Sequence, residues 1–130
     1  MLTKTEIEKI KSIVSNRRGV AYAILFGSAL KHLLVHSDID LLIGGDLDTG
    51  QKTDLSAALA LELRRPIDIV LTKEAHCDLV LRAFSSGIPL AVRDKERVKE
   101  DYFNCYRLCD QERPLKRARI ERLKRVYGNG

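Results

Sequence analysis

Three aspartates lie on predicted strands that could belong to one sheet, where their carboxylates together could bind metal. Asp38 and Asp40 open the segment DIDLLI, which is apolar and typical of a buried strand, and Asp68 lies in the similar segment PIDIVLT. Strand side chains alternate between faces, so Asp38 and Asp40 are expected on one face. Mg²⁺ favours one or two carboxylates together with substrate phosphates. If the two strands are neighbours, the three acids suit two-metal phosphoryl or nucleotidyl transfer.

A glycine and a serine between the first predicted strand and the next helix add a second part to this site. Gly27 and Ser28 follow the apolar segment VAYAILF. Free backbone N–H groups and the helix dipole favour phosphate at such a turn. Gly27 would allow close approach, Ser28 would donate a hydroxyl, and Lys31 would add a positive charge. The turn is therefore predicted to bind a triphosphate. Asp-x-Asp alone also occurs in glycosyltransferases and hydrolases, and only the whole combination favours a metal-nucleotide site.

The elements that must position these residues alternate between helix and strand. Thr3 and Glu6 form a capping-box pattern at the start of a helix that runs to about residue 17. Thr72 is predicted to cap a helix that runs to Phe84. The pattern predicts strands at 20–26, 38–43, 66–72 and, at an edge, 88–92, further helices at 29–35 and 51–65, and a helical region from 94 with a break at Pro114. The fold class is α/β, one domain with a helical C-terminal extension.

Composition limits the class of protein. The chain has 130 residues, of which 45% are hydrophobic and 32% charged, as in a soluble domain. Its apolar runs are too short for a membrane span, and MLTKTEIEKI does not resemble a signal peptide, so the cytosol is the expected location. An odd number of cysteines, three, predicts no disulfide framework. Zinc binding by the set His76, Cys77, Cys105 and Cys109 is an alternative, but buried, packed cysteines are favoured.

Basic residues crowd the end of the chain, whose net charge is +5. Such a segment can bind nucleic acid through phosphates, but no aromatic residues interleave there to stack bases. A solvated helix face, or a patch that docks on an acidic partner, is therefore the favoured interpretation. The residues are Arg113, Lys116, Arg117, Arg119, Arg122, Lys124 and Arg125.

The segments FGSALKHLLVHSDIDLLI, RPIDIVL and SSGIPLAVRD resemble the minimal nucleotidyltransferases of the DNA polymerase β superfamily, in particular the MntA-type antitoxins encoded beside HEPN-domain toxins. The resemblance covers roughly residues 5–95. It implies a small mixed β-sheet flanked by helices, with ATP as substrate and two Mg²⁺ ions. It also implies transfer of AMP to a hydroxyl, typically a tyrosine, of the partner toxin.

The resemblance also implies roles for individual residues. Gly27 and Ser28 would bind the triphosphate, with Lys31 where the family often has arginine. Asp38 and Asp40 would ligate both metals, and Asp68 would ligate the catalytic metal and help to deprotonate the acceptor. One departure is His32, which stands where the family usually has glycine. We expect a nucleotidyltransferase domain at 1–95 and a basic helical extension at 96–130.

Two other functions remain open at this stage. The protein could neutralise a partner by contact alone, although clustered acids without a role cost stability. It could instead transfer a nucleotide to RNA or a small molecule, for which the basic segment is the only positive indication. For a catalytic cluster, like-charge repulsion predicts that at least one carboxylate pKa is raised. Removing the residues after Asp110 is expected to weaken transfer to a toxin more than ATP binding.

Overall fold

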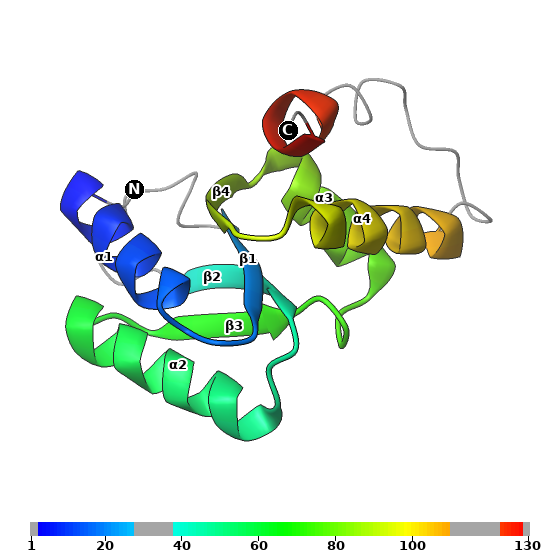
Figure 1. Ribbon diagram of the computed structural model, residues 1–130. Helices are drawn as coiled ribbons and strands as arrows, with labels where there is room; N and C mark the ends of the chain where they lie inside the picture. Colours follow the sequence, from blue (N-terminus) through cyan, green and yellow to red (C-terminus); the bar gives the residue numbers. More distant parts are fainter. Residues whose placement is uncertain (1–2, 28–37, 110–122, 129–130) are drawn as a thin grey trace.

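A four-stranded mixed sheet lies between two pairs of helices in a computed structural model of the chain, which describes residues 3–27, 38–109 and 123–128 (Figure 1). The strands are β1 (Val20–Phe26), β2 (Ile39–Gly45), β3 (Ile67–Leu71) and β4 (Ile88–Val92), in the spatial order β3-β2-β1-β4. Strand β2 runs parallel to β3, and β1 runs antiparallel to both β2 and β4. The predicted mixed sheet and the edge position of β4 are confirmed.

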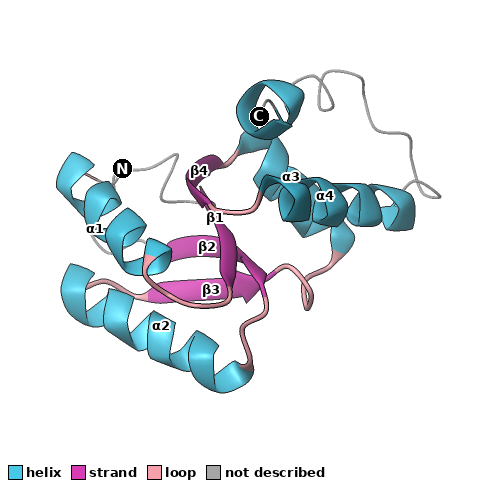
Figure 2. Cartoon of the chain, viewed as in Figure 1, coloured by secondary structure: helices cyan, strands magenta, loops and turns pink. Residues whose placement is uncertain are grey.

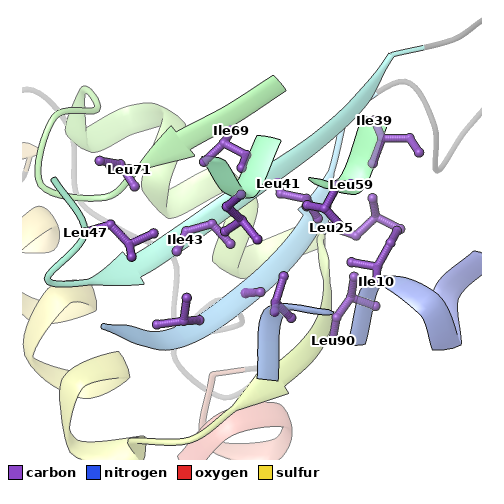
Figure 3. Close-up of a cluster of buried hydrophobic side chains, with 14 of the residues drawn as sticks. Ile10, Leu25, Ile39, Leu41, Ile43, Leu47, Leu59, Ile69, Leu71 and Leu90 are labelled. Carbon is purple, nitrogen blue, oxygen red and sulfur yellow. The ribbon is translucent and has the colours of Figure 1, made fainter. Parts of the chain in front are cut away.

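Helices α1 (Lys4–Ser15) and α2 (Thr49–Leu63) cover one face of the sheet (Figure 2). The capping box predicted at Thr3 is present, since its hydroxyl accepts from the Glu6 amide and its own amide donates to the Glu6 carboxylate. Helix α2 begins earlier than predicted because Asp48 and Gln51 form a second capping box. Aliphatic side chains of both helices and of all four strands form the core beneath them (Figure 3).

Helices α3 (Cys77–Ser86) and α4 (Lys95–Cys109) contact each other and the opposite face. The prediction that Thr72 caps α3 is wrong: His76 is the N-cap. The Thr72 hydroxyl instead lies 2.7 Å from that of Tyr22 on β1, within the sheet's core. A single π-helical turn, η2 (Lys124–Gly128), packs Tyr127 edge-on against Phe84 of α3, with ring centroids 5.4 Å apart.

One expectation about the cysteines is wrong. Cys77, at the start of α3, is joined by a disulfide to Cys109, at the end of α4, while Cys105 is a buried free thiol. The two helices cross so that residues 32 positions apart in sequence meet, which no local pattern signals. Within the described part of the chain, no helix has both the length and the apolar composition needed to span a membrane.

Candidate active site

Two of the three predicted acids lie directly opposite each other on neighbouring strands. Asp40 is the second residue of β2 and Asp68 the second of β3, and the parallel register pairs them. Partners in register project from the same face, so both carboxylates lie on the face that α3 and α4 cover farther along the strands. The condition set by the sequence, that the two acidic strands be neighbours, is met.

Asp38 completes the acidic group from just outside the sheet. It is exposed and precedes the first residue of β2, whereas Asp40 is half-buried. Burial raises the pKa of the Asp40 carboxyl above its ordinary value, and the negative charges of Asp68 and then Asp38 raise it further. The predicted upward shift is therefore confirmed for Asp40, but loss of hydration, rather than charge repulsion, is its largest cause.

No cation neutralises this cluster within residues 3–27, 38–109 and 123–128. In that part of the chain, no side chain or backbone amide donates a hydrogen bond to the carboxylate of Asp38, Asp40 or Asp68, and none forms an ion pair with them. Polar groups that lose hydration are normally paired. A half-buried carboxylate that has no partner and lies beside two others is typical of a site that binds a cation.

Gly27 contacts the acidic cluster directly. It follows β1, whose last residue, Phe26, pairs with Asp40, and its φ of +85° lies in the left-handed region. A side chain there would be strained, and a Cβ atom would collide with a carboxylate oxygen of Asp40. The glycine therefore allows the turn and the carboxylate to occupy adjoining space, as a phosphate-binding turn beside a metal site would require.

A hollow of about 350 Å³ opens next to Asp68, between β3 and α2. Its polar lining includes Lys52, Thr53 and Ser56, none of which the sequence marked as part of a site. These residues belong to α2, which covers the face of the sheet opposite to the Asp40 and Asp68 carboxylates, so the hollow reaches Asp68 only at the edge formed by β3. Ser28 and Lys31, together with the helix predicted at 29–35, lie outside the described residues.

The sequence model of the family described as "Polymerase beta, Nucleotidyltransferase" matches residues 8–96, which include β1, β2, β3 and all three aspartates. The chain belongs to this nucleotidyltransferase family. The fold class and the enzyme class predicted from the sequence, a nucleotidyltransferase, are thereby confirmed. The match ends at residue 96, within α4, which packs directly on the sheet; the division into 1–95 and 96–130 stays a prediction.

Solved structures give this nucleotidyltransferase its fold neighbours. A toxin–antitoxin complex of MntA and HepT matches with a TM-score of 0.67 at 20% identity, covering 84% of this chain and 88% of that one. A complex of tri-AMPylated Shewanella oneidensis HEPN toxin with MNT antitoxin matches with a TM-score of 0.67 at 20% identity over 85% and 88% of the two chains. A toxin–antitoxin structure with AMP-PNP matches with a TM-score of 0.64 at 22% identity over 85% and 89%. No curated protein matches the chain in sequence.

Proposed function

We propose that this nucleotidyltransferase transfers AMP from ATP, with Mg²⁺, to a tyrosine hydroxyl of a partner HEPN-type toxin, and so acts as an antitoxin. The observation that carries the proposal is the pairing of Asp40 with Asp68 across β2 and β3, beside Gly27. The fold neighbours, which include an AMPylated HEPN toxin complex and an AMP-PNP complex, favour this acceptor and this nucleotide.

The donor set fits magnesium. Asp38, Asp40 and Asp68 offer hard carboxylate oxygens, and no described side chain competes for them. Magnesium, when bound there, would neutralise phosphate charge and polarise the phosphorus–oxygen bond that breaks. The raised pKa of Asp40 has the same implication, because a neighbouring cation favours the ionised carboxylate that burial and like charges disfavour.

Residues of the chain would bind the triphosphate and accept the proton of the tyrosine. Gly27 and Ser28, with Lys31, would bind the triphosphate at the end of β1. Asp68 would accept the proton of the tyrosine hydroxyl as its oxygen bonds to the α-phosphorus. The bond from that phosphorus to the bridging oxygen would break, and pyrophosphate would leave.

The test is transfer to a HEPN-type toxin, which we would seek in the gene beside the one that encodes this protein. Purified protein, ATP, Mg²⁺ and toxin should yield toxin that carries AMP on a tyrosine, located by peptide mass spectrometry. Asp40→Asn and Asp68→Asn should each lower the rate at least hundredfold, since such charge stabilisation is worth several kcal/mol. Asp54→Asn is the matched control, because Asp54 is exposed on α2, which covers the face of the sheet opposite to the cluster. An unmodified toxin in a tight, inhibited complex would support contact-only neutralisation instead, and label on RNA would identify a different acceptor.

The role of the basic segment needs a different variant from the truncation that the sequence suggested. Leu123 and Tyr127 are only 5% and 3% exposed, so removing everything after residue 110 would also remove core side chains. Lys124 and Arg125 are exposed on η2, and the other basic residues lie outside the described part of the chain. Replacing both with glutamate should weaken transfer to the toxin while ATP binding stays unchanged. Equal loss of both would argue against docking.

A further inference from the structure

A disulfide, an exposed histidine and a helix N-terminus meet on the side of the molecule formed by α3 and α4. Cys77 is the first residue of α3 and is bonded to Cys109, the last residue of α4. His76, the N-cap of α3, is exposed, and its Nδ1 lies 3.9 Å from Sγ of Cys77. The ligand atoms of these three residues all lie within 4.8 Å of one another. Neither the metal-nucleotide site nor the proposed transfer uses them.

The fold does not depend on this bond to hold α4 in place. Asp101 of α4 accepts a hydrogen bond of 2.6 Å from the Tyr22 hydroxyl, and Arg97 donates to the Gly45 carbonyl at 3.1 Å. The Tyr102 ring packs edge-on against Phe84 of α3, with centroids 5.8 Å apart. These contacts fix the first two turns of α4 on the sheet, so the disulfide adds its constraint only to the last turn.

The two sulfur atoms differ in environment. Cys77 is partly exposed at the N-terminal end of α3, where free amides and the helix dipole stabilise a thiolate. Cys109 is 9% exposed and lies at the C-terminal end of α4, where the dipole opposes negative charge. Cys105, one turn earlier, is no competitor, because burial and the charge of Asp101 raise the pKa of its thiol.

We propose that Cys77 and Cys109 form a reversible thiol–disulfide exchange site that takes dithiol reductants as its substrate. A thiolate of the reductant attacks Sγ of Cys77, the more exposed of the two cysteines, the bond to Cys109 breaks, and Cys109 leaves and gains a proton. The second thiol of the reductant then attacks the mixed disulfide, and Cys77 leaves as a thiolate that the N-terminus of α3 stabilises. Two electrons pass from the dithiol to the pair, and the reductant becomes a disulfide.

The consequence of exchange is confined to one place. Opening the bond releases the last turn of α4 from the start of α3, while the Tyr22–Asp101 and Arg97–Gly45 hydrogen bonds stay in place. Those two hydrogen bonds join α4 to β1 and to the end of β2, the strand that carries Asp40. The exchange therefore removes the covalent link between the end of α4 and the start of α3, without unfolding the domain.

Differential alkylation of the full-length protein in buffers of reduced and oxidised dithiothreitol, read by peptide mass spectrometry, tests the proposal. We expect a Cys77–Cys109 cross-link that opens and recloses as the ratio of reduced to oxidised dithiothreitol changes, with circular dichroism unchanged. In the reduced protein, Cys77 should alkylate at least tenfold faster than Cys109. Cys105→Ser, which removes a thiol from the same helix, should behave like the wild type. In oxidised glutathione, Cys109→Ser should form a mixed disulfide with glutathione at Cys77.

Three results would overturn the proposal. The cross-link could resist excess dithiol until the protein is unfolded, which would make it a structural staple. Cys77 and Cys109 could alkylate at the same rate, which would remove the asymmetry. Finally, the reduced protein could bind one equivalent of Zn²⁺ through His76 and both thiolates and then fail to reclose in oxidised dithiothreitol, which would make the group a metal site.

Discussion

Two places on the same face of the sheet carry buried or half-buried polar groups, and they are organised in opposite ways. The Tyr22 hydroxyl, farther along the sheet, is fully paired, since it contacts Thr72 and donates to Asp101. Asp40, near the start of β2, has no such partner among the described residues and faces a second carboxylate across the strand pair. Polar groups that serve the fold are satisfied within it, whereas groups that serve a ligand are left for that ligand.

The electrostatics of the two places match this difference. Burial, followed by the hydrogen bond to Asp101, raises the pKa of the Tyr22 phenol, so it stays neutral at any ordinary pH. Burial and two like charges raise the pKa of Asp40, so its surroundings disfavour the ionised carboxylate. The Tyr22 hydroxyl is therefore satisfied without a ligand, whereas the Asp40 carboxylate has no partner among the described residues. Three variants test this contrast, in order of decreasing effect on stability, and a melt with ligand then tests the central claim.

The paired region should be the costlier one to disturb. Tyr22→Phe removes the hydroxyl that joins Thr72 to Asp101, so Thr72 keeps only its bond to the Ile43 carbonyl and Asp101 only its contact with Arg97. This should lower the free energy of unfolding by about 2 to 3 kcal/mol. Urea denaturation measures this. Tyr106→Phe is the matched control, since no hydrogen bond to the Tyr106 hydroxyl is seen within the described ranges, and it should change little. Equal effects would show that the Tyr22 network is not a special contributor.

Gly27→Ala should separate stability from ligand binding. The methyl group meets Asp40 and the left-handed φ strains the backbone, so the free energy of unfolding should fall by about 1 to 2 kcal/mol. Binding of Mg·ATP should fall far more, because both the turn and the carboxylate are displaced. Gly50→Ala is the control: its Cβ would meet Asp48 at 3.4 Å, an ordinary contact, so stability and nucleotide binding should change little. Calorimetric titration that finds unaltered nucleotide binding in Gly27→Ala would refute this account of the turn.

These contrasts also mark what the sequence could and could not predict. Apolar segments and the Thr3 capping box predicted the strands and the first helix, because those signals are local. The pairing of Asp40 with Asp68 remained conditional until the parallel register of β2 and β3 supplied it. The prediction that Thr72 caps α3 was wrong because its hydroxyl bonds to that of Tyr22, 50 residues away, and not to the backbone of a helix. The sequence did not predict the Cys77–Cys109 bond for the same reason, since the bond depends on how two helices cross.

The smallest effect, and the one with opposite sign, is expected at the acidic cluster itself. The pKa of Asp40 is raised in the folded state, so the fold binds its proton more tightly than the unfolded chain does. The resulting stability is fully present below the ordinary value of 3.8 and is lost as pH rises through the folded pKa. Asp40→Asn should therefore raise Tm slightly at pH 7 without ligand, and the gain should shrink at acidic pH. A lower Tm for Asp40→Asn at pH 7, with Asp54→Asn unchanged, would indicate a structural role.

The central claim is that the acidic cluster at the start of β2 and β3 exists to hold magnesium and nucleotide. The most direct measurement is the thermal melt of wild type and Asp40→Asn with ATP, with and without Mg²⁺. At a ligand concentration of about 100 times Kd, binding adds about 2.7 kcal/mol, which for a domain of this size raises Tm by on the order of 10 °C. We predict this rise for the wild type only when both ATP and Mg²⁺ are present, and no rise for Asp40→Asn. An equal rise in the variant, or a rise that does not need Mg²⁺, would contradict the account.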